Sequence, residues 1–264
     1  MARILARLTW NEEVAPGYHL MATEAPEIAA QAAPGQFVHV RVGPSYDPLL
    51  RRPFSILRTD KAAGQVWMLV KVVGRGTRLL AGMAPGTTLD VMGPLGHGFP
   101  EPPLGDEVVL VAGGVGVAPL IFWADRLQTA FSHVRVVSIY GAATEEALAC
   151  WLDLAARSDE FYAATEDGSA GEAGLASDAL RGLLAQRGVG TIYACGPRPM
   201  LAACAAAAAE AGVPCFVAME QWMGCGVGAC LGCVVPAAGG GYLRVCSEGP
   251  VFAAEALDWE ALAR

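Results

Sequence analysis

The sequence predicts a multidomain α+β protein with three parts: an antiparallel β-barrel, a doubly wound α/β domain and a small cysteine-rich domain. The first hundred residues contain short apolar or alternating runs that are separated by Gly, Pro and Asp clusters. Longer apolar runs, alternating with Ala- and Leu-rich stretches, begin near Glu107, and four of the eight cysteines follow Phe216. We therefore expect domains at residues 1–101, 102–216 and 217–264.

The composition indicates a folded protein and argues against several classes. Of the 264 residues, 17% are charged and 54% are hydrophobic, which is the opposite of a disordered chain. The formal net charge is -8 and no basic run occurs, so we expect no nucleic-acid partner. The longest uncharged stretch, residues 108–124, is shorter than roughly 18 residues and contains Gly and Pro, so we expect no membrane span. The amino-terminal residues lack a signal-peptide pattern, which predicts a cytoplasmic location.

The barrel prediction depends on residues 36–42 and 66–73, whose short apolar and alternating patterns are typical of strands. The segment FPEPPLGDE, residues 99–107, should connect the barrel to the next domain. Proline disfavours both a helix and a central strand, and it suits a linker.

The α/β prediction depends on three apolar runs, VVLVAG, VRVVSIYG and TIYACG, which are typical of buried parallel strands. Strong helix formers fill residues 119–130 and 200–211, and the second helix should end at Gly212. The final domain has too few apolar residues for a core of its own. A bound metal or a partner should therefore help it to fold.

Four cysteines of the final domain have the spacing C-x4-C-x2-C-x12-C, and the first three match plant-type [2Fe-2S] ferredoxins. Thiolate sulfur is the soft ligand that iron in such a cluster prefers. Structural zinc is an alternative, although zinc ribbons usually have two C-x2-C pairs and this segment has one. Disulfides are a weaker alternative. The predicted ligands are Cys225, Cys230, Cys233 and Cys246.

The glycines between these cysteines belong to the same predicted site. Gly226, Gly228 and Gly232 allow the loop to wrap closely and to point backbone N–H groups at sulfur. The other cysteines have no ligand spacing, and isolated cysteines commonly behave as small buried hydrophobes. We expect that role for Cys150, Cys204 and Cys215.

A glycine-rich turn follows the first strand of the α/β domain and leads into a helix. Free N–H groups and the positive end of the helix dipole suit a nucleotide pyrophosphate there, although tight packing would also favour glycine. The later run TIYACG ends at Cys195, at the edge where open α/β sheets bind ligands, so Cys195 can face a nicotinamide as the candidate catalytic residue. The predicted nucleotide-binding residues are Gly113, Gly114, Gly116, Pro119, Gly196 and Pro197.

Two motifs of the barrel domain, RRPFSI and GRGTRL, can bind a flavin dinucleotide. Arg52 can pair with its pyrophosphate, and Gly76 and Thr77 can supply backbone and hydroxyl donors. Taken alone, an exposed arginine more often has no special role.

The order RPFS, GRGT, GPLG, AGGVGVAP and CGPRPM resembles the ferredoxin-reductase superfamily. With the C-terminal MEQWMGCGVGACLGCVV, essentially the whole chain is similar to the electron-transfer subunits of type B dihydroorotate dehydrogenases. The resemblance implies FAD, [2Fe-2S] and NAD as cofactors, and it implies that the four cysteines hold the cluster. The residues that it assigns to FAD are Arg52, Pro53, Phe54, Ser55, Leu69, Val70, Lys71, Gly76 and Thr77.

The resemblance also implies a partner and a path. The partner would be an FMN-containing catalytic subunit, in a heterotetramer with two copies of each chain. Electrons would pass from dihydroorotate to FMN, to the cluster, to FAD and to NAD+, in pyrimidine (UMP) biosynthesis. A flavin is the converter that joins two-electron hydride transfer to one-electron transfer.

The sequence departs from the family pattern at three positions. Phe54 replaces the Tyr of the wider superfamily, and Trp222 stands where we expect a basic residue. His97 replaces an expected Asn, and we expect it to be a solvated loop residue. Glu220 is a candidate carboxylate for the flavin edge or an interface, against the alternative of a solvated side chain.

NAD is favoured over NADP because Glu145 and Glu146, with no Arg, follow the second strand of the α/β domain, and acid disfavours a 2'-phosphate. Two alternative functions stay open. One is a reductase subunit of a hydrogenase, a sulfide dehydrogenase or a ferredoxin-NAD(P) system. The other is a zinc-stabilised, nucleotide-binding regulatory protein without redox activity.

Overall fold

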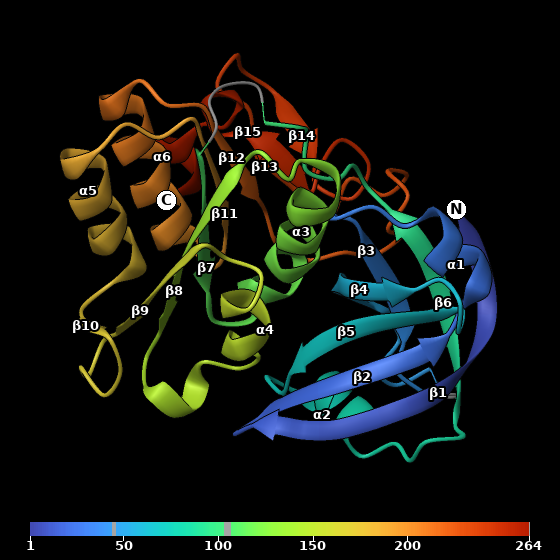
Figure 1. The fold of residues 1–264 in the computed structure, drawn as a ribbon. Helices are drawn as coiled ribbons and strands as arrows, with labels where there is room; N and C mark the ends of the chain where they lie inside the picture. The colour runs from blue at the N-terminus through green and yellow to red at the C-terminus, as the bar shows by residue number, and fades with distance from the viewer. Residues whose placement is uncertain (44–45, 103–106, 264) are drawn as a thin grey trace.

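The computed structural model describes residues 1–43, 46–102 and 107–263. In this part of the chain, a closed six-stranded barrel lies beside a seven-stranded sheet that is flanked by helices, and a small two-stranded sheet belongs to the C-terminal segment (Figure 1). This arrangement confirms the predicted fold class. No helix of the described residues is long and apolar enough to cross a membrane.

The barrel has the strand order β1-β2-β5-β4-β3-β6, and every neighbouring pair is antiparallel. Inward-facing side chains such as Val38, Val40 and Met68 fill it, and Ile28 and Leu80 of two short helices join the same core. The predicted strands at residues 36–42 and 66–73 are confirmed. The elements are β1 (Ala2–Ala15), β2 (Tyr18–Glu24), α1 (Pro26–Gln31), β3 (Phe37–Arg41), β4 (Arg52–Asp60), β5 (Gln65–Lys71), α2 (Arg75–Ala81) and β6 (Thr88–Leu95).

The second sheet has the order β10-β9-β8-β7-β11-β12-β15, and its strands from β10 to β12 are parallel. These elements include the predicted runs and both predicted helices; α6 ends at Gly212, which has the left-handed φ of 67°. The elements are β7 (Glu107–Gly113), η1 (Gly114–Gly116), α3 (Val117–Ala130), β8 (Arg135–Ala142), η2 (Glu145–Ala147), α4 (Trp151–Ala155), β9 (Glu160–Thr165), β10 (Glu172–Ala173), α5 (Ala176–Gln186), β11 (Thr191–Cys195), α6 (Arg198–Ala211) and β12 (Cys215–Ala218).

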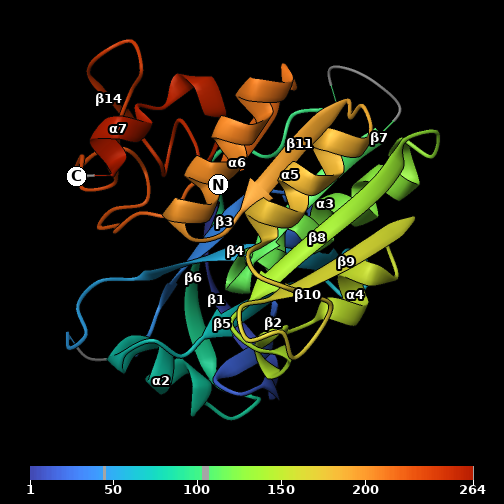
Figure 2. The ribbon, with the colours of Figure 1, turned by 90° about the vertical axis from the view of Figure 1, so that its left-hand side faces the viewer.

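After Glu107, the central strand β7 is apolar because helices cover both of its faces. Val108 and Leu110 point to the core that contains α3, whereas Val109 and Val111 point to the core that contains α5 and α6. The view in Figure 2 shows α5 and α6 lying in front of the sheet.

The C-terminal segment shares its core with the other two parts. Its elements are β13 (Val234–Pro236), β14 (Tyr242–Arg244), β15 (Val251–Ala253), η3 (Ala254–Ala256) and α7 (Trp259–Leu262). β15 pairs with β12 in antiparallel orientation. Val235 and Val245 belong to the same core as Val109 of the α/β part and Phe37 of the barrel. β12 itself continues across the predicted boundary after Phe216, so the segment obtains its core from its neighbours.

Phe99, the first residue of the predicted linker at residues 99–107, is packed in the protein interior. The ring of Phe99 stacks on Trp123 at 5.9 Å between centroids and meets Tyr193 edge-on at 5.6 Å. The Tyr193 hydroxyl donates to the backbone carbonyl of Pro100 at 2.9 Å. Phe99 is thus part of the interior and not of a linker. Residues 103–106 of this prediction lie outside the described residues.

Candidate functional site

The predicted nucleotide-binding turns meet at the carboxyl ends of β7 and β11, which are neighbouring parallel strands. A Cβ atom on Gly116 would lie 2.2 Å from the carbonyl oxygen of Cys195. A Cβ atom on Gly113 would lie 2.7 Å from both Met200 Sδ and Pro197 Cδ. These two glycines are therefore required by the packing of one turn against the other, as the alternative reading of the motif allowed.

Gly114 has a different reason to be glycine. Its φ is +52°, in the left-handed region, and an added Cβ would meet only the Tyr18 hydroxyl, at 3.5 Å. The turn therefore exposes its backbone on this side, where the first turn of α3 begins. Pro119 is buried in that first turn, where its missing N–H costs no helix hydrogen bond.

Tyr140 on β8 holds this turn in place through its hydroxyl group. The sequence did not predict this role. The buried Tyr140 hydroxyl lies 3.0 Å from the Gly114 carbonyl and 3.1 Å from the Ala149 carbonyl, as a donor that the two oxygens share. Burial raises the pKa of the phenol, with smaller effects of Tyr18 and Cys150, so it stays a donor. The only hint in the sequence is a hydroxyl-bearing residue at the end of an apolar strand.

Cys195 lies at the end of β11 as predicted, and Gly196 and Pro197 follow it. Burial raises the pKa of its thiol to about 12, and the negative charge of Glu220 adds to this effect. At neutral pH Cys195 is therefore a protonated thiol, which suits contact with a ring and not attack as a nucleophile. The structure places the exposed Glu220 close enough to Cys195 for their charges to interact.

The predicted flavin-binding motifs of the barrel come together at the start of β4. A Cβ atom on Gly76 would lie 3.1 Å from Arg52 Nε, so the absence of a side chain leaves room for the guanidinium. Arg52 Nη1 donates to the Leu50 carbonyl at 2.6 Å. Its Nε and Nη2 groups have no acceptor among the described residues. They are the donors that could bind a pyrophosphate.

The Thr77 side chain forms hydrogen bonds with the backbone just before α2. Its hydroxyl accepts hydrogen bonds from the backbone N–H groups of Val73, at 3.0 Å, and Gly74, at 3.1 Å, and lies 3.1 Å from the Gly74 carbonyl, to which it donates. The side chain thus shapes the start of α2.

The remaining predicted flavin residues face different directions. Phe54 belongs to the barrel core, while Pro53 and Ser55 alternate with it along β4 and are half-buried. Leu69 and Val70 are buried. Lys71, at the end of β5, places Nζ 5.2 Å from the centre of the Tyr18 ring.

Tyr18 joins the predicted flavin and nucleotide sites. Its ring lies beside Lys71 of the barrel, and its hydroxyl is the nearest side-chain atom to the open face of Gly114. Tyr18 and Leu69 share a core with Val117 of α3. The end of β5 and the glycine-rich turn are therefore adjacent, as hydride transfer between two bound cofactors requires.

The cysteine loop surrounds its sulfur atoms with backbone donors. Cys225 Sγ accepts from the N–H groups of Val227 and Cys230, both at 3.4 Å. Cys246 Sγ accepts from the Gly228 N–H group at 3.1 Å. Cys230 Sγ accepts from the Gly232 N–H group at 3.5 Å, and Cys233 Sγ accepts from the Cys246 N–H group at 3.4 Å. Gly226 and Gly228 have φ values of +73° and +81°, so this wrapping depends on glycine.

The donor set fits thiolate ligands. Burial opposes ionisation of Cys225, but the amides of Val227 and Cys230 outweigh it and lower the pKa of its thiol to about 6. Among the described residues, no three His, Cys, Asp or Glu side chains converge on the position of one metal ion. Cys225 lies close enough to Cys230, and Cys246 close enough to Cys233, for the two thiols of each pair to influence each other's pKa. The backbone N–H donors around the four sulfurs suit the negative charge of a bound iron-sulfur cluster.

The remaining residues discussed from the sequence are three cysteines, His97 and Trp222. Cys204 and Cys215 are buried in the core, and Cys150 is half-buried at the start of α4. The exposed His97 uses its backbone N–H to donate to the Gly249 carbonyl at 2.6 Å. The Trp222 side chain is 88% exposed.

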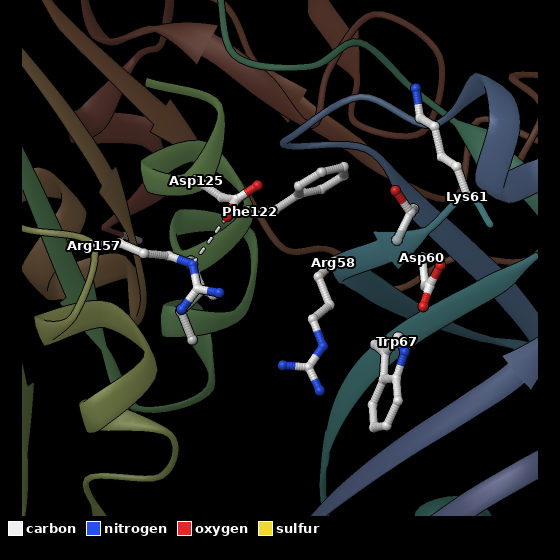
Figure 3. A pocket seen from close by; sticks show the side chains of 9 residues that line it. Arg58, Asp60, Lys61, Trp67, Phe122, Asp125 and Arg157 are labelled. Atoms are coloured by element: carbon white, nitrogen blue, oxygen red, sulfur yellow. Dashed lines mark hydrogen bonds and ion pairs between the residues drawn. The ribbon is translucent and has the colours of Figure 1, made fainter. Parts of the chain in front are cut away.

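A cavity of about 420 Å³ lies between the barrel and α3, and none of the predicted site residues lines it (Figure 3). The Arg58 guanidinium lies 4.3 Å from the centre of the Trp67 ring on one side of it. On the other side, Arg157 Nε pairs with Asp125 at 3.2 Å. The two arginines that line this cavity, Arg58 and Arg157, therefore already interact with other side chains of the protein.

Family models match three successive parts of the chain. An oxidoreductase FAD-binding domain matches residues 7–99, and an oxidoreductase NAD-binding domain matches residues 110–206. The iron-sulfur cluster binding domain of dihydroorotate dehydrogenase B matches residues 220–258. Each match falls within one of the three predicted domains. They confirm FAD, NAD and an iron-sulfur cluster as the cofactors of the chain.

Individual proteins agree with these models. The dihydroorotate dehydrogenase B (NAD(+)) electron transfer subunit of Desulforamulus reducens is 41% identical over 250 residues, covering 94% of this chain and 95% of that protein. The subunit of the same name from Bacillus caldolyticus is 46% identical over 225 residues, covering 84% and 85%. A solved structure of an NADH-dependent reduced ferredoxin-NADP oxidoreductase has a TM-score of 0.87 and 32% identity, covering 99% of this chain and 92% of that chain. The chain belongs to the family of dihydroorotate dehydrogenase B (NAD(+)) electron transfer subunits.

Proposed function

We propose that this chain carries electrons from the FMN of a dihydroorotate dehydrogenase catalytic subunit to NAD+, by way of a [2Fe-2S] cluster and FAD, in pyrimidine (UMP) biosynthesis. The contact through Tyr18 carries this proposal, because it puts the end of β5 beside the open backbone of Gly114. When bound, FAD exchanges a hydride with the nicotinamide and single electrons with the cluster. The chain itself binds, orients and shields these groups.

On the flavin side, we assign the pyrophosphate to Arg52, whose Nε and Nη2 donors lie against Gly76. The backbone of Gly76 and Thr77 completes this site at the start of α2, and the Thr77 hydroxyl holds the turn in shape. Pro53, Ser55 and the β5 residues Leu69 to Lys71 would line the ring. We assign Phe54 to the support of β4 from inside the barrel, because it belongs to the barrel core.

On the nucleotide side, the backbone at Gly114 would hold the pyrophosphate of NAD, and Tyr140 would hold that backbone in place. Cys195 would contact the nicotinamide as a neutral thiol. Glu145 and Glu146 would disfavour the 2'-phosphate of NADP. The Glu145 backbone N–H donates to Ser169 Oγ at 2.7 Å, and that hydroxyl lies 2.6 Å from Asp167 Oδ1, so this edge of the sheet is acidic.

The family name implies a partner catalytic subunit, and we propose that the FMN-containing subunit docks on the surface around the cysteine loop. The side chains of Trp222, Val227 and Leu231 are exposed there. Exposed apolar side chains next to a redox centre mark an interaction surface, and Trp is enriched in such surfaces. We propose a heterotetramer with two copies of each chain. A reducing compartment, the cytoplasm, would keep the four cysteines free to bind iron.

The experiment is reconstitution with an FMN-containing subunit that oxidises dihydroorotate. We expect NADH formation that requires dihydroorotate, both chains and the cluster. A Trp222→Ser variant should weaken assembly of the complex and leave NADH oxidation by the isolated chain unchanged. If the complex reduces NAD+ without any dependence on dihydroorotate, the proposal is wrong.

A second candidate function is a component of a ferredoxin-NADP oxidoreductase, which the TM-score of 0.87 favours. The same preparation distinguishes the two functions. A preference for reduced ferredoxin with NADP+ as substrates, and no response to dihydroorotate, would support the second candidate.

A further inference from the structure

His39 is a buried imidazole on the wall between the barrel and the C-terminal segment. Its neighbours Val38 and Val40 fill the barrel core, so His39 points outward from β3. Opposite it in the sheet stand Pro53 of β4 and Met92 of β6. The residue is 0% exposed, and neither ring nitrogen makes a hydrogen bond of ordinary geometry with the described residues.

The ring lies against the cysteine loop. A Cβ atom on Gly226 would be 2.6 Å from His39 Nδ1 and 3.4 Å from its Cε1 atom. Gly226 directly follows the predicted ligand Cys225 and has a φ of +73°. Glycine at this position thus serves both the turn of the loop and the close approach of the imidazole.

Proteins rarely bury a polar group without a partner, because such a group loses its hydrogen bonds to water and gains none. Burial lowers the pKa of His39 to about 4; a backbone interaction with Arg51 opposes this effect, and the charges of Arg51 and Arg52 add to it. The ring is therefore neutral near pH 7. A neutral imidazole carries one N–H donor, and the nitrogen next to the loop is Nδ1.

We propose that His39 is a positioning residue for the cluster: its Nδ1–H group donates a hydrogen bond to a sulfur of the bound [2Fe-2S] cluster. The bond would hold the Cys225 end of the loop against β3. It would also raise the reduction potential of the cluster, because a donor stabilises the more negative, reduced form. The inference rests on the cluster site of the proposed function and not on the identity of the partner.

The test uses the full chain loaded with FAD and cluster, without a partner. His39→Leu removes the donor at similar size, and His39→Gln keeps an N–H donor. We measure the midpoint potential of the cluster by titration followed by EPR, and that of the flavin by absorbance. His39→Leu should weaken the electron affinity of the cluster about tenfold, which is about 59 mV for one electron. His39→Gln should restore at least half of this shift.

His19→Leu is the matched control, since His19 Nδ1 has a partner in Asn11 Oδ1 at 3.0 Å and lies on β2. It should leave the cluster potential unchanged. The proposal is overturned if His39→Leu leaves the cluster potential unchanged, if only the flavin potential moves, or if His39→Gln shifts the potential as much as His39→Leu. Should His39→Leu fail to fold, His39→Gln alone decides: because it keeps a donor, a fall of the cluster potential by about 59 mV or more overturns the proposal. Loss of dihydroorotate dependence would affect the proposed function without altering this result.

Discussion

The turn after β7 and the cysteine loop before β13 are both rich in glycine and both belong to proposed binding sites, but they are held in place differently. In the turn, Gly113 and Gly116 make room for Pro197, Met200 and the Cys195 backbone, and Tyr140 fixes the result. In the loop, positive φ values let amides reach sulfur. The turn is thus held by side-chain and backbone packing, whereas the loop is held by backbone N–H groups that donate to cysteine sulfur.

The largest expected effect comes from removing a ligand of the loop. Cys230→Ala should abolish cluster assembly, because a [2Fe-2S] cluster of this type is held by four cysteine thiolates and the variant keeps three of the predicted ones. Cys204→Ala, in the core, should cost about 1 kcal/mol of stability and leave the cluster spectrum intact. Iron content and absorbance of the purified chains measure both. A normal cluster in Cys230→Ala would refute the ligand assignment.

The glycine-rich turn after β7 should lose its shape when a side chain is added at Gly116. Gly116→Ala puts a methyl group 2.2 Å from the Cys195 carbonyl oxygen and should displace the turn. A displacement of this kind costs about 100-fold in kcat/KM for NADH. FAD and iron content should stay normal. Gly182→Ala on α5, where an added Cβ meets nothing within 4 Å, is the control and should stabilise the chain by up to about 1 kcal/mol. Equal behaviour of the two variants would contradict the packing role of Gly116.

A smaller change should result from Tyr140→Phe. It leaves two buried carbonyl oxygens without their shared donor, which costs roughly 1–3 kcal/mol. We expect a higher KM for NADH and a lower melting temperature with no change in the cluster spectrum. Tyr162→Phe, which loses only an exposed bond to Glu160, serves as the comparison. An unchanged KM in Tyr140→Phe would show that the turn does not depend on this hydroxyl.

The smallest effect concerns the choice of nucleotide. Glu145→Gln with Glu146→Gln removes two exposed negative charges near the end of β8. Each contributes at most about 1 kcal/mol of repulsion in water, so the use of NADPH should improve about fivefold. NADPH and NADH oxidation by the isolated chain are compared at one low ionic strength. Unchanged ratios would place the ribose elsewhere.

Local patterns in the sequence predict most of the elements. The apolar runs and the strong helix formers depend on residues that are close in the chain, and these predictions agree with the structure. The cysteine spacing is also local, and the iron-sulfur prediction that it carries agrees with the family model over residues 220–258. The missed features depend on distant residues: Tyr140 with Gly114, His39 with Gly226, and Phe99 with Trp123 and Tyr193. No periodicity within one segment signals such contacts.

The strand β15 has a consequence for biosynthesis. It closes the edge of the parallel sheet at β12, although it comes from residues 251–253. While the chain emerges from the ribosome, β12 stays an open edge until those residues appear, and an open edge invites pairing with another chain. A nascent or truncated chain that lacks β15 should therefore aggregate even when its nucleotide-binding half is complete.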